Sequence, residues 1–216
     1  MSIGVNVVRD LFPEAFPRVL LYPVRFGWLL SIANQEKKLN SYLREFKEQL
    51  HRHGDSVESV VFPYCFAHHW FMINISFANR RVEYAEGFNR EPLPIIIFQE
   101  IMSFLKEHLE VDTTSWDSLP KRREAPQQTD GYSCGPIALE CILDVCSGFD
   151  PSKFEPIIWD ESLADQRRLD WINRSVWQHW ETRHAAKKAL AESLVQPEVH
   201  SEKRLHVVCQ CTVRVC

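Results

Sequence analysis

Hydrophobic residues follow two different spacings in the first half of the chain. Over residues 34–53 they recur at steps of three and four, which is the spacing of one face of an amphipathic helix. Residues 57–62 and 69–77 are instead rich in β-forming side chains, and 81–86 resumes that pattern after a short turn. We therefore expect one helix, then a strand ended by Pro63, then a hairpin of two antiparallel strands.

The second half of the chain predicts further helices. Apolar residues crowd 94–110, which is typical of a largely buried helix, and residues 134–149 open with Pro136, which suits a first helical turn. A long helix is expected over 160–195. The stretch 120–128 between these helices predicts a short strand or an extended arm.

The order of these elements predicts an α+β fold in which helices and a sheet form layers. Residues 1–27 hold several prolines among apolar residues, so we expect an extended lead-in with little regular structure. A single catalytic domain is expected over 28–195. Residues 196–216 have no evident partner, so they are either a further strand or a tail unrelated to the domain.

Charge and hydropathy exclude several classes of protein. The 216 residues carry a net charge of −4 with both signs mixed, unlike the basic surplus of a general nucleic-acid binder. No apolar run reaches the roughly 18 residues of a membrane helix, and acidic residues and prolines interrupt the N-terminus where a secretory signal is apolar. We expect an intracellular monomer, nuclear or cytoplasmic, that binds neither nucleic acid nor membrane.

The seven cysteines suit neither a disulfide framework nor a zinc site, because their number is odd and no pair of C-x-x-C motifs is present. Cys141 and Cys146 lie inside the predicted helix and are assigned to packing. Cys134 differs because it stands where that helix begins, in the stretch QQTDGYSCGPI. Free N–H groups and the helix dipole favour a thiolate at such a position.

The glycines near Cys134 support a nucleophile over a buried packing residue. Gly135 removes side-chain bulk beside the sulfur, so that a substrate carbonyl can approach. Gly131 permits a tight turn that presents the sulfur at a surface cleft. Cysteine statistics alone favour a buried helix cysteine. The Gly-x-x-Cys-Gly-Pro context shifts the balance towards a nucleophile.

A cysteine nucleophile needs a base, and the base needs an orienting acceptor. His69 begins one strand of the predicted hairpin, and Glu86 ends its partner seventeen residues later, so the two ends meet. The carboxylate of Glu86 can then accept a hydrogen bond from Nδ1 of His69. Taken alone, Glu86 fits an exposed charge at the end of a strand.

The sequence also offers an oxyanion donor. Gln128 precedes Cys134 by six residues, and its amide can donate to the oxygen of a reacting carbonyl. The backbone N–H of Cys134 is the second donor. Gln127 is a weaker candidate, one residue out of register.

These residues stand in a characteristic chain order: His69-Trp70, Glu86, Gln128 and Cys134-Gly135. The order and spacings resemble the ubiquitin-like protease family of cysteine peptidases, of the SUMO-specific protease and adenovirus-endopeptidase type, over about residues 28–180. Glu86-Gly87 stands where most eukaryotic members have Asp-Ser, and the adenovirus type uses glutamate. The resemblance implies a papain-like cysteine peptidase variant with a small central mixed sheet flanked by helices.

The resemblance implies hydrolysis of the peptide or isopeptide bond after the C-terminal Gly-Gly of a ubiquitin-like modifier. The modifier would be SUMO, NEDD8 or ubiquitin, with a SUMO-type protein favoured, and no metal or organic cofactor would be needed. Cys134 would attack, His69 would transfer the proton and Glu86 would orient His69. Gln128 would hold the oxyanion.

Substrate binding is implied for Gly135 and for Trp70, which would line the tunnel that admits the Gly-Gly tail; simple core packing is the alternative for Trp70. Two other functions remain open. The chain could be a catalytically silent, modifier-binding or mobile-element-derived protein that retains the fold, or an acetyltransferase with the same triad. The run 121–123 is a weak candidate for an inositol-phosphate pocket and otherwise fits a solvated strand end.

Overall fold

The computed structural model describes every residue except 1, 89–91, 150–154, 156 and 196–216. The chain forms two compact units, Met1–Gln178 and His179–Cys216. The first unit contains the sheet and all of the candidate site residues. The predicted tail, 196–216, lies outside the described residues.

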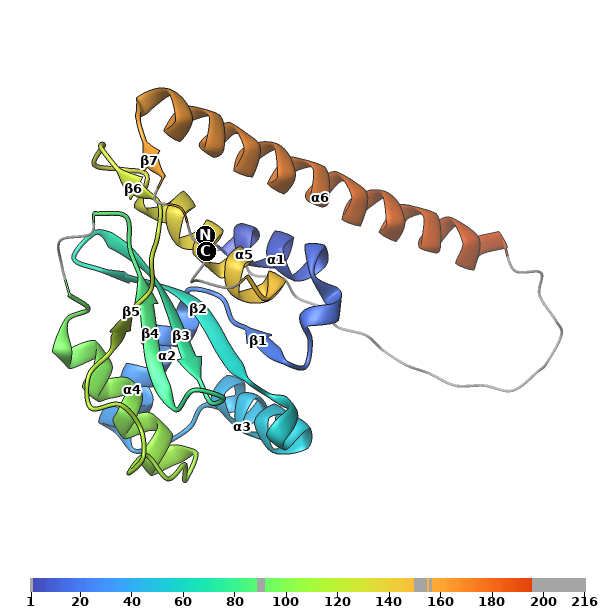
Figure 1. Cartoon of the computed structure of the whole chain (residues 1–216). Helices are drawn as coiled ribbons and strands as arrows, with labels where there is room; N and C mark the ends of the chain where they lie inside the picture. The colour runs from blue at the N-terminus through green and yellow to red at the C-terminus, as the bar shows by residue number, and fades with distance from the viewer. Residues whose placement is uncertain (1, 89–91, 150–154, 156, 196–216) are drawn as a thin grey trace, which may run out of the picture. The chain divides into compact units, whose positions relative to one another are not determined.

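A five-stranded mixed sheet forms the centre of the first unit (Figure 1). Its strands, in spatial order, are β1 (Val19–Leu21), β2 (Ser59–Phe66), β3 (His69–Ser76), β4 (Arg81–Ala85) and β5 (Lys121–Arg122). The three central strands are antiparallel, whereas each edge strand pairs in parallel with its neighbour. A separate parallel pair joins β6 (Gln127–Gln128) to β7 (Ile158–Trp159).

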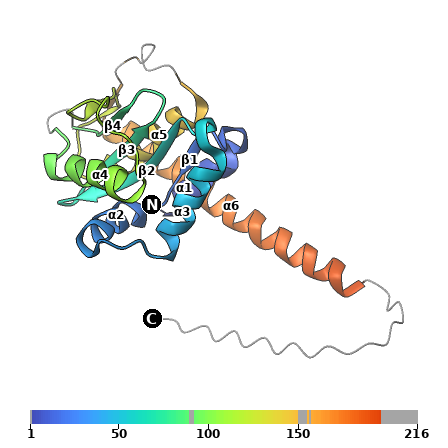
Figure 2. The same ribbon diagram turned by 90° about the horizontal axis from the view of Figure 1, so that it is seen from below.

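Helices cover both faces of the sheet (Figures 1 and 2). They are α1 (Ser2–Leu11), α2 (Arg25–Glu36), α3 (Ser41–His53), α4 (Ile95–His108), α5 (Cys134–Ser147) and α6 (Glu161–Val195), with 3-10 turns η1 (Pro13–Ala15) and η2 (Gly54–Ser56). Helices α2, α3 and α4 pack on one face. Helices α1 and α5 pack on the other face, together with the first turns of α6.

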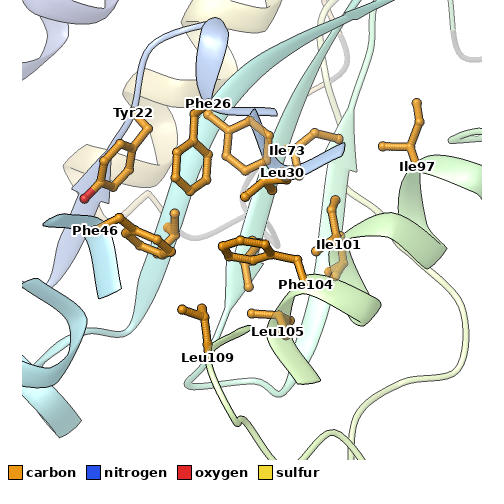
Figure 3. Packing of buried hydrophobic residues seen from close by; sticks show 14 of the residues in the cluster. Tyr22, Phe26, Leu30, Phe46, Ile73, Ile97, Ile101, Phe104, Leu105 and Leu109 are labelled. Carbon is orange, nitrogen blue, oxygen red and sulfur yellow. The ribbon is translucent and has the colours of Figure 1, made fainter. Parts of the chain in front are cut away.

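The two sides of the sheet bury separate hydrophobic clusters because successive strand residues point to opposite faces. On the α2–α3–α4 side, aromatic rings fill the layer, as Figure 3 shows for Tyr22, Phe26, Phe46 and Phe104. The ring of Phe26 stacks on Tyr22 with centroids 4.4 Å apart and meets Phe46 edge-on at 5.0 Å. The α5 side is lined by smaller side chains, which lets α5 lie close to β3.

The strongest patterns in the sequence are confirmed. Strands β3 and β4 occupy the predicted hairpin to within a residue at each end, and α4, α5 and α6 occupy their predicted segments to within two residues. The arm 120–128 contains two short strands, β5 and β6. In the ranges described above, no helix is both long and apolar enough to cross a lipid bilayer.

The prediction for the N-terminus is wrong, because residues 1–27 are largely structured. They form α1, η1, β1 and the start of α2 rather than an extended lead-in. Val8 of α1 is fully buried in the cluster around α5, and β1 adds a parallel edge strand to β2. These tertiary contacts involve residues far along the chain, so local composition did not reveal them.

Two boundaries predicted between residues 34 and 63 are also wrong. The single helix is divided, because Lys37 takes a left-handed backbone (φ 51°) that ends α2, and the Asn40 side chain then accepts a hydrogen bond from Leu43 N–H at 2.9 Å to cap α3. Strand β2 continues through Pro63 to Phe66. Because β1 pairs only with 59–61, Pro63 lies where β2 is an edge, and its missing N–H costs no ladder bond.

Candidate active site

A two-residue turn closes the β2–β3 hairpin and places His69 at the start of β3. Phe66 pairs with His69 across the hairpin, and the turn residues Ala67 and His68 have positive φ values of 47° and 65°. Two positive values are what a tight turn compatible with strand twist requires. His69 is therefore the first residue of β3, anchored by the sheet.

Glu86 follows the last residue of β4 and meets His69. Nε2 of His69 lies 3.1 Å from Oε2 of Glu86. The expected contact to Nδ1 is wrong, since the other ring nitrogen faces the acid, and Nδ1 is left for a nucleophile. Phe88 stacks on the imidazole at 5.1 Å and Phe71 meets it edge-on at 4.9 Å, so aromatic rings on two sides restrict its orientation.

Glu86 is fully buried, which excludes the alternative of an exposed charge at a strand end. Its Oε2 also accepts from the Phe88 N–H at 2.7 Å, and its Oε1 accepts from Nη2 of Arg122 at 2.5 Å. Both carboxylate oxygens are thus held by donors.

The sequence analysis missed the role of Arg122 and its neighbour Arg123. Strand β5 lies beside β4, so the two arginines each reach a buried glutamate: Arg122 binds Glu86, and Arg123 binds Glu83 with Nη1 2.8 Å from Oε2. Burial raises the pKa of Glu83, but hydrogen bonds and charge from Arg123, with bonds from Asn74 and Arg81, leave that pKa below its usual value. The basic run is therefore neither a solvated strand end nor a phosphate pocket.

An aspartate turn positions Cys134 as the first residue of α5. Oδ1 of Asp130 accepts from the N–H groups of Tyr132 at 2.9 Å and Ser133 at 2.7 Å, and Oδ2 accepts from the Ser133 hydroxyl at 2.6 Å. Burial raises the pKa of Asp130, yet these bonds and the charge of Arg168 hold it below the usual value. Asp130 was not predicted, although an aspartate shortly before a helix is a common turn signal.

Cys134 lies at the same end of the sheet as His69. Burial, followed by the negative charge of Cys134, raises the pKa of Cys65, and Cys65 pairs with Trp70 beside the hairpin turn. Cys134 as a residue is only 4% exposed, and its presentation at a surface cleft stays a prediction. Within the described part of the chain, no hydrogen bond joins its sulfur to His69.

Gln128 lies between Gly87 and the first turn of α5. Its backbone N–H donates to the Gly87 carbonyl at 2.7 Å, and its Nε2 donates to the Asp130 carbonyl at 2.6 Å, which leaves one amide hydrogen for another acceptor. Its Oε1 is buried without a hydrogen-bond partner among the described residues. Nε2 of Gln127, the weaker candidate, instead donates to the Ala125 carbonyl at 2.8 Å.

Of the two predicted substrate-binding residues, Trp70 is partly exposed and Gly135 is buried. Trp70 is half-buried and packs against the cluster that contains α5, so core packing accounts for part of its surface. Gly135 is buried within α5. Their role in substrate binding stays a prediction.

The helix cysteines behave as the sequence predicts for packing residues. Burial raises the pKa of Cys141 far above its ordinary value and that of Cys146 to about 11. Both therefore remain thiols at neutral pH. Among the described residues no group of three or more His, Cys, Asp or Glu is placed to hold a metal ion.

No family model matches the chain, and no curated protein matches it in sequence. Solved structures do match. A protease domain of yeast Ulp1 in complex with Smt3, the yeast ortholog of SUMO, is 16% identical with a TM-score of 0.54, over 76% of this chain and 71% of that one.

Two further structures match in the same way. The Ulp1-like SUMO protease catalytic domain of Chaetomium thermophilum is 18% identical with a TM-score of 0.54, over 81% of this chain and 66% of that one. A de-sumoylating protease is 15% identical with a TM-score of 0.51, over 91% and 87%. At these identities the likeness is one of fold, and the expected fold, a central mixed sheet flanked by helices, is confirmed.

Proposed function

We propose that the chain is a cysteine peptidase that hydrolyses the bond after the C-terminal Gly-Gly of a ubiquitin-like modifier, acting as a monomer in the nucleus or cytoplasm. The observation that carries the proposal is the His69–Glu86 pair, with a cysteine that opens a helix at the same end of the sheet. The fold shared with SUMO proteases supports the same reading. SUMO is the favoured modifier, with NEDD8 and ubiquitin as the other candidates.

The proposed reaction proceeds in two acyl-transfer steps. The sulfur of Cys134 attacks the carbonyl carbon after Nδ1 of His69 takes its proton. The tetrahedral intermediate collapses, the bond to nitrogen breaks, and His69 returns the proton to the departing amine. Water then attacks the thioester with His69 again as base, which releases the modifier's carboxylate and the free thiol.

The remaining residues would stabilise charge in this scheme. Glu86 accepts from Nε2 of His69 and stabilises the imidazolium that forms in each step. The free amide hydrogen of Gln128 and the N–H of Cys134 would hold the oxyanion, since the first N–H groups of a helix have no intrahelical acceptor. Sulfur and imidazole must approach one another when substrate binds, as happens in many enzymes whose catalytic bonds tighten only in the complex.

The burial of Cys134 favours a narrow substrate tail. A cysteine that is only 4% exposed as a residue is reached most easily by a segment without side chains, and two glycines meet that condition. Trp70 would then cover the tail, with Gly135 giving room beside the sulfur.

A second candidate function is modifier binding without catalysis. It is favoured by the missing hydrogen bond between Cys134 and His69 in the described residues, because a silent relative has no need of that contact. Under this alternative the buried His69–Glu86–Arg122 group would be purely structural.

Probes made from SUMO, NEDD8 and ubiquitin with a C-terminal vinyl sulfone separate the two candidates. We expect the wild-type chain to form a covalent adduct with the SUMO probe, mapped by mass spectrometry to Cys134. Cys134→Ala should form none while keeping its circular dichroism spectrum, and Cys65→Ser is the matched control that should still react. Folded wild-type protein that reacts with no probe would reject the peptidase, and noncovalent binding of a modifier would then favour the silent alternative.

A further inference from the structure

We propose that Arg122 is a positioning residue that holds the carboxylate of Glu86 aimed at His69. The inference rests on the proposed function of this site and adds Arg122 to the triad of Cys134, His69 and Glu86, as a residue that acts through Glu86 without touching substrate. It follows from how the two oxygens of one buried carboxylate are shared.

The two oxygens of the Glu86 carboxylate contact different partners. Oε2 faces Nε2 of His69 at 3.1 Å and the Phe88 N–H at 2.7 Å, while Oε1 faces Nη2 of Arg122 at 2.5 Å. A glutamate side chain has one more rotatable bond than an aspartate, so its carboxylate has more orientations to choose from. With Arg122 holding one oxygen, the other is directed at the imidazole.

Charge supplies a second reason. The Glu86 side chain has no exposure to solvent, and a buried carboxylate is costly unless a cation or several donors face it. His69 would be a cation only during part of the proposed cycle, whereas a guanidinium is charged throughout. Arg122 therefore gives the buried carboxylate a positively charged partner throughout the proposed cycle.

The neighbouring residue provides a matched control. Arg123 stands next to Arg122 at the end of β5 and pairs with Glu83, which is also buried. Glu83 keeps Arg81 and Asn74 as partners if Arg123 is replaced. The two arginines thus make the same kind of contact, and only Arg122 reaches the candidate triad.

Arg122→Gln removes the charge and keeps a hydrogen-bond donor, while Arg122→Lys keeps the charge and loses the planar fork. Both should be compared with Arg123→Gln and the wild type. The first measurement is the rate of Cys134 alkylation by iodoacetamide between pH 5 and 10, read by mass spectrometry. It needs no modifier substrate, and thermal unfolding and circular dichroism identify the variants that fold.

The groups that face the site determine the expected result. His69 faces Glu86 at the end of β4 and lies at the same end of the sheet as Cys134 of α5 and Cys65 of β2, while Arg122 of β5 faces Glu86. Removing the guanidinium changes the charge next to the Glu86 carboxylate, which contacts His69 directly. The electrostatic environment of Cys134 changes with it, so the midpoint of Cys134 alkylation moves away from its wild-type value in Arg122→Gln.

The second measurement is turnover of whichever modifier substrate the wild type cleaves. In Arg122→Gln we expect kcat to fall about 10- to 100-fold with KM within about twofold, because a misdirected base affects the chemical step more than binding. Arg122→Lys should keep the wild-type alkylation midpoint and recover part of kcat. Arg123→Gln should keep both within about twofold of the wild type.

The outcomes separate this inference from the proposed function. Equal alkylation midpoints in Arg122→Gln and Arg123→Gln overturn the positioning role, even if the wild type cleaves a modifier. A shifted midpoint in Arg122→Gln alone supports it, even if no modifier is cleaved and the proposed function fails. Should Arg122→Gln not fold, Arg122→Lys decides: a kcat equal to that of Arg123→Gln overturns the role, and a kcat below it supports the role.

Discussion

A Cβ atom on Gly87 would lie 2.4 Å from Oε1 of Gln128 and 2.8 Å from Cδ1 of Ile137. Gly87 follows Glu86, and Ile137 lies in the first turn of α5, so the acid, the amide and the helix meet at this glycine. Most members of the family that the sequence resembles have serine at this position. The absence of a side chain at Gly87 is therefore a requirement of how Gln128 is packed in this chain.

Gly87→Ala should displace the Gln128 amide and lower kcat. A contact of 2.4 Å is too short for two heavy atoms, so the side chain or the segment after β4 must move. Loss of one oxyanion donor costs about 10²- to 10³-fold in kcat, and we expect a loss of at least about 10-fold here. Steady-state cleavage of the modifier substrate measures it.

Gly131→Ala is the control for the Gly87 substitution. It lies three residues before Cys134, and nothing approaches its Cβ position within 4 Å. We expect its kcat to stay close to that of the wild type. Equal activity of the two variants and the wild type would show that Gln128 does not contribute to the reaction.

Replacing the two residues of the turn before His69 should stabilise the folded protein. Ala67 and His68 both have positive φ values, which cost roughly 1 kcal/mol for a residue with a Cβ atom. Replacing the pair by Asn-Gly, the usual residues of such a turn, should raise the free energy of unfolding by about 1 kcal/mol. Urea unfolding followed by circular dichroism measures the change. A lower free energy of unfolding would mean that contacts of the His68 side chain stabilise the fold by more than its positive φ destabilises it.

Acid should destabilise the protein through Glu83. The pKa of Glu83 is lowered in the folded chain from a reference of 4.5, so its ion pairs stabilise the fold above about that pH. This contribution is lost as pH falls through the folded-state pKa. The free energy of unfolding should therefore decline below about pH 4.5, at no more than about 1.4 kcal/mol per pH unit for this one group.

Glu83→Gln should flatten that decline, with urea unfolding at pH 3, 4, 5 and 7 as the measurement. Glu110→Gln is the control, because Glu110 pairs with Lys47 at the surface, where an ion pair contributes little to stability. An unchanged slope in Glu83→Gln would assign the acid sensitivity to other carboxyl groups, with Asp130 the next to test. The pKa of Asp130 is also lowered in the fold.

Local patterns in the sequence predicted the parts of the fold that depend on local structure. The β3–β4 hairpin and α5 follow from spacing and from residues such as Pro136, and the meeting of His69 with Glu86 follows from counting along a hairpin. Which imidazole nitrogen meets the acid depends on the ring's rotamer, which the packing of Phe71 and Phe88 restricts. A linear sequence does not contain that information.

The parts that were missed depend on contacts between distant residues. Arg122 is 36 residues from Glu86, and they meet only because a two-residue strand pairs in parallel with β4. The helix α1 is stabilised at a proline-containing N-terminus because Val8 is buried against α5. The Arg122–Glu86 contact leaves no periodic signal, so it needed the three-dimensional structure. The apolar residues of α1 do follow helical spacing, and the sequence analysis missed that pattern because of the prolines that follow it.

The pKa of Cys65 gives an independent measure of where Cys134 lies. Burial raises this pKa from 9.0, and the negative charge of Cys134 raises it further. Removing that charge in Cys134→Ala should let Cys65 ionise at lower pH, so at pH 9 its alkylation by iodoacetamide should be at least about twofold faster. Mass spectrometry of the Cys65 peptide measures the rate. Cys141→Ala is the matched control, because Cys141 is buried in α5 and remains a thiol at that pH. If Cys65 reacts equally fast in both variants and in the wild type, Cys134 carries no charge close enough to Cys65 to affect its ionisation at that pH.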